Sequence, residues 1–591
     1  MRSIVGAGPF GPAIPYHFPI VFTRTRILVC VAALVAASAA AQRGPQGDAA
    51  VDVQLLAFND FHGALEPPSG GTGRVGGIDA GGVEYLAAHL VRLKATNPHT
   101  LIVSAGDNIG GTPLLSSLFH DEPTIEALNQ IGLQLSALGN HELDEGWWEL
   151  YRMQRGGCHP VDGCQDGTRF AGAAFSYLAA NVTLDPRRAE PEMLRRGGVH
   201  GLDPRPLLPG WTVRDVGGVR IGFIGLVLKD VPRVIVARSI TGLAFGPEAE
   251  AANAAARALR MQGVEAIVVL MHEGGDQKGR DINGCEEMSA GLVEIVDRMS
   301  DDIDVVVTGH SHQAYNCTID GKLVTSAASS GRLITDIDLR VRRSDGEIVA
   351  KSARNVVVTR DVEKDRDQTT LLARYVSRAA AVGGRVVGSI TASLTRTANE
   401  AGESTLGDVV ADALLDAARR APGAKADLAL WNPGGIRADL DARPGQGTTP
   451  VTYAEVFVVL PFGNDLIVKS VTGETILQML EQQFGGLSGA GGRVRIMQVS
   501  AGFTYAYDPS RPFGQRIDRT SVRVNGEPLV LDKTYRLATS NFLWDAGDGL
   551  EALKAATDPM VVGVDHEILA DYFSRHSPVA PGPQNRIRRI R

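Results

Sequence analysis

Short apolar runs alternate with helical patterns along the first two thirds of the chain. Six runs have the length and side-chain pattern of strands, at residues 53–58, 101–103, 133–138, 219–226, 266–271 and 303–307. Helical spacing of apolar residues predicts helices between them, at 83–93, 122–131 and 249–261. Residues 151–172 carry glycines and cysteines and are expected to be irregular. Alternating strands and helices predict a layered α/β domain, which binds its ligand beyond the carboxyl ends of the strands.

A second pattern begins after residue 384. The charged segment 360–384 contains a helical stretch from Asp361 to Ala381, closed by two glycines, and is read as an interdomain linker helix. Beyond it we expect a helix from Glu403 to about Arg420 and a strand at 428–431, the start of a mixed α/β domain. Because 591 residues are too many for one core, we predict domains at 42–359 and 385–591.

The composition is that of a globular protein, with 44% hydrophobic and 21% charged residues. The net charge of −8 argues against general nucleic-acid binding, which usually needs a basic surface. Oligomeric state does not follow from the sequence.

The first 41 residues have the features of a secretory signal. Arg24 and Arg26 precede an apolar run, and Ala39 and Ala41 provide small residues for cleavage before Gln42. We therefore expect an exported protein, periplasmic or secreted, with no stable membrane anchor after cleavage. The alternative is that the segment is retained as an N-terminal anchor.

Four cysteines remain after that segment. An even count in an exported chain favours disulfides, and three pairings are open. We favour Cys158–Cys164 as a local clip and Cys285–Cys317 as a bridge between two loops. A cysteine-based zinc site is the poorer alternative, since no C-x-x-C pair exists.

Polar residues follow five of the predicted strands. Each loop brings carboxylate, amide or imidazole groups, in the motifs Asp60-Phe61-His62, Gly106-Asp107, Gly139-Asn140-His141-Glu142, His272 and Gly309-His310-Ser311-His312. Such ligands suit two divalent cations, and they admit Zn, Mn, Fe or Co without selecting among them. Two close cations can clamp the oxygens of a phosphoryl displacement and activate water near neutral pH. The pattern therefore predicts phosphate-ester hydrolysis.

The order of these motifs resembles the calcineurin-like metallophosphatases. Together with Asn432-Pro433-Gly434-Gly435-Ile436-Arg437, Pro461-Phe462-Gly463-Asn464 and Phe542 to Gly549, it resembles the two-domain 5′-nucleotidases, which include periplasmic UDP-sugar hydrolases. This resemblance implies a metallophosphatase domain at 42–359 and a substrate-binding domain at 385–591. It also implies rotation of the second domain to carry substrate to the metals.

The resemblance implies a role for each matched residue. One metal would be held by Asp60, His62 and His312, and the other by Asn140, His272 and His310, with Asp107 bridging the two. His141 would face the phosphate as an acid or charge stabiliser, oriented by Asp144. Substrate would be bound by Arg396 and Arg437 at its ionised groups, Phe462 and Phe542 around the base, and Asn464 and Asp548 at the base or ribose.

The chain departs from the family pattern at three places. Asn399 and Glu400 stand where a second arginine often follows Arg396, and Pro433 replaces a common glycine. Trp544 and Asp545 occupy a loop where small residues are usual, which leaves room for a reshaped base pocket.

We therefore expect hydrolysis of nucleoside 5′-monophosphates, with UDP-sugars and nucleoside di- and triphosphates as further candidate substrates. The alternatives are a 2′,3′-cyclic-nucleotide 2′-phosphodiesterase with 3′-nucleotidase activity, a less favoured thiosulfate-oxidation hydrolase, and a non-catalytic nucleotide-binding surface protein.

Overall fold

A computed structural model describes residues 49–68, 73–445, 447–485 and 494–590. The predicted signal segment at 1–41 lies outside these residues. Among the helices that are described, none is long and apolar enough to cross a membrane.

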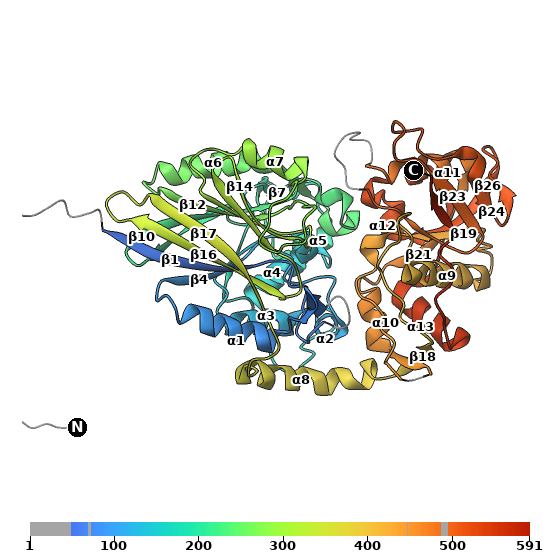
Figure 1. The fold of residues 1–591 in the computed structure, drawn as a ribbon, viewed down its shortest axis with the longest axis horizontal. Helices are drawn as coiled ribbons and strands as arrows, with labels where there is room; N and C mark the ends of the chain where they lie inside the picture. The colour runs from blue at the N-terminus through green and yellow to red at the C-terminus, as the bar shows by residue number, and fades with distance from the viewer. Residues whose placement is uncertain (1–48, 69–72, 446, 486–493, 591) are drawn as a thin grey trace, which may run out of the picture. The chain divides into compact units, whose positions relative to one another are not determined.

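Two six-stranded sheets form the N-terminal domain (Figure 1). The first has the order β17 (Ile348–Val357), β16 (Leu333–Arg342), β1 (Ala50–Phe58), β4 (Thr100–Ser104), β5 (Leu135–Ala137), β6 (Ser176–Leu178). The second has the order β14 (Ala314–Ile319), β15 (Lys322–Ala327), β13 (Val305–Thr308), β12 (Ala266–His272), β10 (Val219–Val227), β9 (Trp211–Val216). Their central strands are parallel, and β16, β17, β14 and β9 join antiparallel.

Apolar side chains from both sheets meet in one core. Leu55, Val103 and Leu135 of the first sheet are buried with Phe223 and Val268 of the second. Helices cover the outer faces: α1 (Val83–Lys94), α3 (Glu122–Ile131) and α4 (Trp147–Arg155) on the first, α6 (Glu248–Arg260) and α7 (Ala290–Asp297) on the second. The domain is thus the layered α/β sandwich predicted from the sequence.

One local prediction was wrong. Residues 151–155 are helical, because they continue α4, which begins at Trp147 and has Trp147, Leu150 and Met153 fully buried. The remainder of 151–172 is irregular except for an isolated bridge between His159 and Gly163. Both favoured disulfides, Cys158–Cys164 and Cys285–Cys317, are present.

Smaller elements complete this domain. They are β2 (Arg74–Val75), β3 (Ile78–Asp79), α2 (Leu114–Ser117), η2 (His141–Leu143), β7 (Val182–Leu184), α5 (Pro191–Gly197), β8 (Arg205–Pro206), η3 (Val231–Arg233), η4 (Ala237–Ile240) and β11 (Leu243–Phe245).

The predicted linker helix, α8 (Arg366–Gly383), packs on the N-terminal domain. Its Leu371, Leu372 and Tyr375 are buried in the same cluster as α1 and α3. Gln368 Nε2 donates to the backbone oxygen of Ala127 in α3, 3.1 Å away. Asp365 caps the helix by accepting from Gln368 N. The helix is therefore part of the N-terminal core, and the exact domain boundaries stay predictions.

The C-terminal domain is built on a mixed sheet of order β22 (Gln498–Val499), β19 (Leu428–Trp431), β26 (Thr534–Ser540), β21 (Asp465–Thr472), β27 (Thr557–Val564). One face is covered by α9 (Thr405–Arg420), α10 (Tyr453–Val459) and α13 (Asp565–His576), the other by α11 (Gly473–Gln482) and α12 (Asn541–Trp544). The other elements are β18 (Val386–Ile390), η5 (Pro433–Gly435), β20 (Thr449–Thr452), β23 (Phe503–Tyr507), η7 (Arg519–Ser521), β24 (Arg523–Val524), β25 (Glu527–Pro528), η8 (Gly547–Gly549), η9 (Glu551–Ala555) and β28 (Ile587–Arg589).

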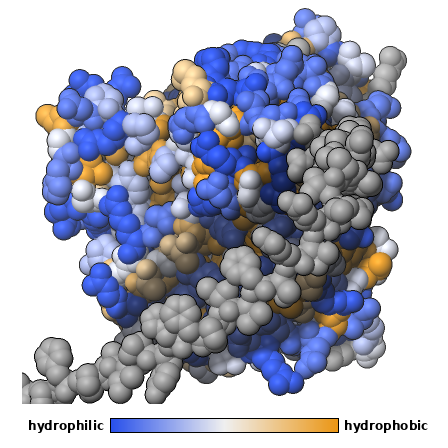
Figure 2. Space-filling model, turned by 90° about the vertical axis from the view of Figure 1, so that its left-hand side faces the viewer, coloured by the Kyte–Doolittle hydropathy of each residue, from blue (hydrophilic) through white to orange (hydrophobic). Residues whose placement is uncertain are grey.

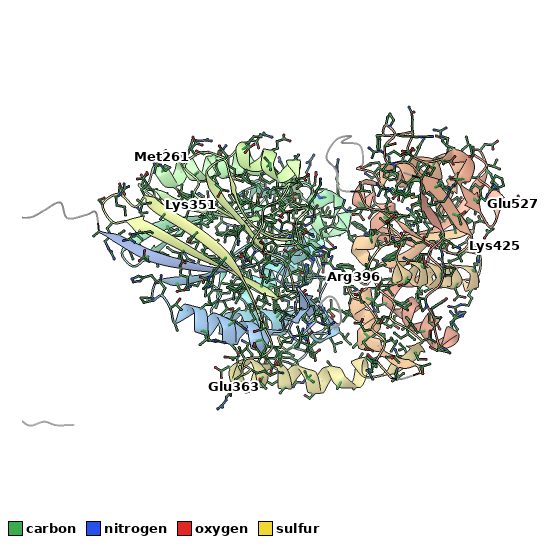
Figure 3. All side chains as sticks on the ribbon, viewed as in Figure 1. Met261, Lys351, Glu363, Arg396, Lys425 and Glu527 are labelled. Atoms are coloured by element: carbon green, nitrogen blue, oxygen red, sulfur yellow. A yellow bond between two sulfur atoms is a disulfide. The ribbon has the colours of Figure 1, made fainter. Side chains whose placement is uncertain are left out.

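The surface carries the polar side chains that the composition requires. Figure 2 shows one face on which hydrophilic residues predominate and apolar residues lie scattered. The exposed charged residues Glu363 and Glu527 lie at the margin of the molecule in Figure 3. The candidate chemistry lies where the strands of the N-terminal domain end.

Candidate active site

The five polar loops meet at one edge of the two sheets. Strands β1, β4 and β5 are parallel neighbours in the first sheet, and β12 and β13 are parallel neighbours in the second. Because parallel strands end at the same edge, the loops after them converge. Every metal ligand predicted from the sequence lies in this cluster.

The first group of ligand atoms comes from Asp60, His62 and His312. His312 Nε2 lies 3.2 Å from Asp60 Oδ1 and 3.2 Å from His62 Nε2. Asp60 is fully buried. One carboxylate and two imidazoles thus face a common point.

The second group comes from Asp107, His272 and His310. His272 Nε2 lies 2.9 Å from Asp107 Oδ2, and Asn140 Oδ1 lies 2.9 Å from His310 Nδ1. Asp107 Oδ2 is also 3.7 Å from His62 Nε2 in the first group. Asp107 is therefore the carboxylate placed between the two groups, as a bridging ligand would be.

An imidazole Nε2 atom points into each group, that of His62 into the first and that of His272 into the second. His62 Nδ1 contacts the backbone oxygen of Gly110 at 2.8 Å, and His272 Nδ1 contacts that of Ala105 at 2.8 Å. A carbonyl oxygen only accepts, so Nδ1 carries the proton and Nε2 is left for the ligand. This donor set, with its outer hydrogen bonds, fits two divalent metal ions of the Zn, Mn, Co or Fe class.

The electrostatics of the cluster agree with cation binding. Burial is the main cause that lowers the pKa of His62, His310 and His312 well below the ordinary range, which leaves them neutral. Burial also lowers the pKa of His272, but the carboxylates of Asp107 and Asp60 raise it to about 10. A cation between His272 and Asp107 would displace that proton.

The ligand loops have costly backbone conformations. Asp60, His62, Asp107, His310 and His312 all have φ between 46° and 65°. Left-handed conformations of this kind are unfavourable for residues with a Cβ and persist where the surroundings enforce them, often at functional sites. Position 139 requires glycine for a steric reason, because an added Cβ would lie only 2.1 Å from Asp107 Oδ1.

Glu142 is a buried residue at this site to which sequence reasoning gave no role. Its buried carboxylate accepts from the backbone N–H groups of Asp107, Asn108 and Gly139 at 3.0, 2.8 and 2.7 Å. It thereby ties the loop after β4 to the loop after β5. Asn59 acts similarly on the first loop, donating to Asp60 Oδ2 at 2.6 Å. The sequence signal that could have identified Asn59 and Glu142 is their position next to or within the two ligand motifs.

His141 lies beside the metal ligands with its predicted partner. Its Nδ1 is 2.9 Å from Asp144 Oδ2, and its backbone N–H donates to Asp107 Oδ1 at 2.8 Å. Burial lowers the pKa of His141, but the carboxylates of Asp144 and Asp107 outweigh it and leave the pKa raised. The ring stacks on Phe462, with centroids 5.4 Å apart. A protonated imidazole next to the ligands can donate to an anion.

The two predicted arginines lie in different settings. Arg437 Nη2 donates to His62 Nε2 at 3.2 Å, so its guanidinium reaches the first ligand group. Arg396, labelled in Figure 3, donates from its backbone to Asp439 Oδ1 at 2.8 Å. Its Nη1 donates to Ile436 O at 3.2 Å. Only Arg437 therefore contacts a predicted metal ligand directly.

The remaining residues predicted to bind substrate lie in the C-terminal domain. Asp548 Oδ2 accepts from Asn432 at 2.9 Å, and Oδ1 lies 3.3 Å from Arg495, a residue that sequence reasoning did not single out. The Phe542 ring covers Gly547, where a Cβ would meet it at 2.4 Å. Asn464 donates its backbone N–H to Asp565 at 3.1 Å.

Trp544 differs from the expectation that it could reshape a base pocket. Its ring is buried in the core, and its Nε1–H donates to Ile467 O at 2.9 Å. Burial of an indole with its N–H satisfied is a packing role. Asp545 is exposed on the same turn.

Comparison with known proteins agrees with this arrangement. Residues 386–555 match the family model of the 5′-nucleotidase C-terminal domain. The chain is 30% identical over 581 residues to the cell wall protein Lmo0130 of Listeria monocytogenes, spanning 93% of this chain and 71% of that protein. A crystal structure of a 5′-nucleotidase precursor from Thermus thermophilus superposes with a TM-score of 0.74 at 28% identity, over 91% of this chain and 99% of that one.

The chain belongs to the two-domain 5′-nucleotidase family. This family consists of metallophosphoesterase hydrolases of phosphate monoesters, which is the enzyme class that the ligand loops predicted. The chain is also 31% identical to endonuclease YhcR of Bacillus subtilis, spanning 91% of this chain but only 41% of the length of that relative.

Proposed function

We propose that this member of the family hydrolyses nucleoside 5′-monophosphates to nucleoside and phosphate, using two divalent metal ions. The observation that carries the proposal is the pair of neighbouring ligand groups, in which Asp107 of the second lies 3.7 Å from His62 of the first, with His141 next to them. The C-terminal family match and the solved 5′-nucleotidase support the choice of substrate class.

Asp60, His62 and His312 would hold one metal, Asn140, His272 and His310 the other, and Asp107 both. When bound, the two cations would supply Lewis-acid stabilisation of the phosphoryl oxygens and a nucleophilic hydroxide near neutral pH. The protein's own side chains bind the phosphate, donate a proton to it or stabilise its charge, and hold the nucleoside in place.

His141 donates its proton toward the phosphate, and Asp144 keeps the ring oriented through Nδ1. The Arg437 guanidinium, already at His62, neutralises the substrate's anionic groups through forked hydrogen bonds. Arg396 adds a second positive group, Phe462 and Phe542 stack on the base, and Asn464 and Asp548 contact base or ribose.

Phosphate release from a substrate panel tests the proposal. The panel is AMP, UMP, UDP-glucose, ATP, 3′-AMP, 2′,3′-cyclic AMP and a single-stranded oligonucleotide, each with added Mn²⁺ or Zn²⁺ and with chelator. We expect chelator-sensitive release that is highest for AMP or UMP and is lost in His141→Ala. Preference for the cyclic or 3′ substrates would instead indicate the alternative function, a 2′,3′-cyclic-nucleotide 2′-phosphodiesterase with 3′-nucleotidase activity. Retention of metal without release from any substrate would favour a binding protein.

We also propose that the protein is exported. Two disulfides form in an oxidising compartment, and one relative is named a cell wall protein. The N-terminal residue of protein recovered from the native host tests this: cleavage should leave Gln42 first, whereas an intact Met1 in the mature protein would contradict the signal assignment.

A further inference from the structure

A second cluster of imidazoles and carboxylates lies in the N-terminal domain apart from the seven predicted metal ligands. His120, Glu145 and His159 place one ligand atom each within 4.8 Å of one another. His120 Nδ1 is 2.8 Å from Glu145 Oε2, and His120 Nε2 is 3.0 Å from Asp162 Oδ2. His159 Nδ1 is 3.1 Å from the same carboxylate group. Two imidazoles therefore share two carboxylates.

Three separate segments deliver these side chains. His120 lies between α2 and α3, Glu145 in the turn after η2, and His159 and Asp162 in the loop closed by the Cys158–Cys164 disulfide. The fold brings the groups together at fixed positions.

The backbone around the cluster is fixed in demanding conformations. His120 and Asp121 have φ of 50° and 60°, both left-handed. Buried Asp121 holds this turn by accepting from Ser116 Oγ at 2.6 Å and Gly110 N at 3.1 Å. The structure therefore keeps the His120 ring in place, stacked on the His159 ring with centroids 3.8 Å apart.

The charges favour a cation at this position. Burial lowers the pKa of His159, and nearby His120 lowers it further, so His159 is the neutral partner. Burial acts downward on His120 too, but Glu145 and Asp162 raise its pKa to about 9. The single positive charge on His120 thus faces two carboxylates, those of Glu145 and Asp162, so these four side chains carry a net negative charge.

We propose that His120, Glu145 and His159, with Asp162 as a further carboxylate, bind a third divalent transition-metal ion. Two imidazole nitrogens and carboxylate oxygens are the ligands of Zn²⁺, Mn²⁺ or Co²⁺, whereas Ca²⁺ and Mg²⁺ prefer oxygen ligands alone. The side chain of His159 is 7% exposed and that of Glu145 is 41% exposed, so the site is open to solvent on one side.

The proposed third site lies next to the residues His141 and Asp144 of the candidate active site. Glu145 directly follows Asp144, whose carboxylate orients His141. A single cavity of about 110 Å³ is lined by His141 and Asp144 as well as by His120 and Glu145. Bound metal would fix the turn that carries both carboxylates.

Zinc stoichiometry after gel filtration in metal-free buffer tests the site. We expect one zinc fewer per chain in His159→Gln and in Glu145→Gln than in the wild type, and no change in His200→Gln, an exposed histidine outside the cluster. Glu145→Gln changes a half-exposed group and should not disturb folding, which circular dichroism checks. Equal zinc in all four proteins overturns the proposal.

A second variant isolates the site from the proposed active centre. Asp60→Asn combined with Asp107→Asn should abolish AMP hydrolysis but keep one zinc per chain, and adding His159→Gln should remove it. Absence of zinc from the double variant overturns the third site. Failure of AMP hydrolysis in the wild type would instead reject the proposed function and leave the zinc count unaffected.

Discussion

His141 and Asp144 form a hydrogen-bonded pair, with Nδ1 of the imidazole 2.9 Å from Oδ2 of the carboxylate. His141 begins η2 and Asp144 directly follows it, and both side chains are half-buried. A carboxylate in this position selects one tautomer of the ring and favours its charged form. The Nε2 edge is therefore free to face substrate.

Replacing His141 should separate catalysis from metal binding. We expect His141→Ala to lower kcat for AMP by about 100- to 10,000-fold, the usual range for a lost general acid. Metal content should be unchanged, since His141 is not among the seven predicted ligands. Loss of metal along with activity would show that His141 holds a cation instead.

Asp144→Asn should have a smaller effect on kcat and a distinct effect on the pH profile. The Asp144 carboxylate raises the pKa of His141, so its removal should lower that pKa. If His141 acts as an acid, the alkaline limb of the kcat profile then moves to lower pH. A uniform loss of rate with an unmoved limb would indicate a structural effect alone.

Asp107 and Asp60 should differ in how much metal they control. Asp107 lies between the two ligand groups, 2.9 Å from His272 and 3.7 Å from His62, whereas Asp60 belongs to the first group. We expect Asp107→Asn to remove two metal equivalents and Asp60→Asn one, measured by elemental analysis. Equal losses would argue against a bridging role for Asp107.

Glu142→Gln should weaken the centre without removing a ligand. An amide nitrogen cannot accept the backbone N–H bonds that both carboxylate oxygens now receive. We expect unfolding free energy to fall by about 1–3 kcal/mol and metal affinity to fall by about 10- to 100-fold. Glu294→Gln, on an exposed helix surface, is the control and should change neither quantity.

Much of the active site could be predicted because its ligands follow strands. The strand ending at His272 and the helix at 122–131 were found from apolar periodicity, and parallel strands bring their ends together. The carboxylate, amide and imidazole groups in the loops after these strands then indicated metal binding. Long-range pairing was not available from such patterns, since β16 pairs with β1 across more than 270 residues.

The partners of individual side chains were also out of reach of local patterns. Trp544 looked like a pocket residue from its loop position, yet its ring packs in the apolar core, where Ile467 O of β21 accepts its N–H. Glu142 looked like the end of a motif, and only the structure shows that it joins two loops. In the proposed third site, His120 lies 25 positions from Glu145 and 42 from Asp162, and no shared motif connects them.

Phe542→Ala should weaken recognition of the base specifically. Stacking of a base on an aromatic ring contributes about 1–3 kcal/mol, which corresponds to a rise in KM for AMP of roughly 5- to 150-fold. Ribose 5-phosphate has the same ester but no base, so its kcat/KM should stay unchanged. If both substrates lose equally, Phe542 supports the fold around Gly547 and does not contact the base.

The pH dependence of the free energy of unfolding should show the titration of the buried Asp408 carboxyl in the C-terminal core. This residue is 1% exposed, and burial together with Glu403 and Asp412 raises the pKa of its carboxyl from 3.8 to about 8, against the opposing effect of Arg586. Between these two pH values the folded state therefore holds a proton that the unfolded state releases. The free energy of unfolding should consequently fall as pH rises, by up to about 1.4 kcal/mol per pH unit.

Asp408→Asn removes this titration and should flatten the profile. The variant should be more stable than the wild type near pH 8, because it no longer has to bury a charge, and the two should converge toward pH 4. Urea unfolding across this pH range measures the difference, with exposed Asp203→Asn as the matched control. Parallel profiles for wild type and Asp408→Asn would mean that Arg586, whose Nε lies 3.6 Å from Asp408 Oδ1, keeps the carboxylate ionised in the fold.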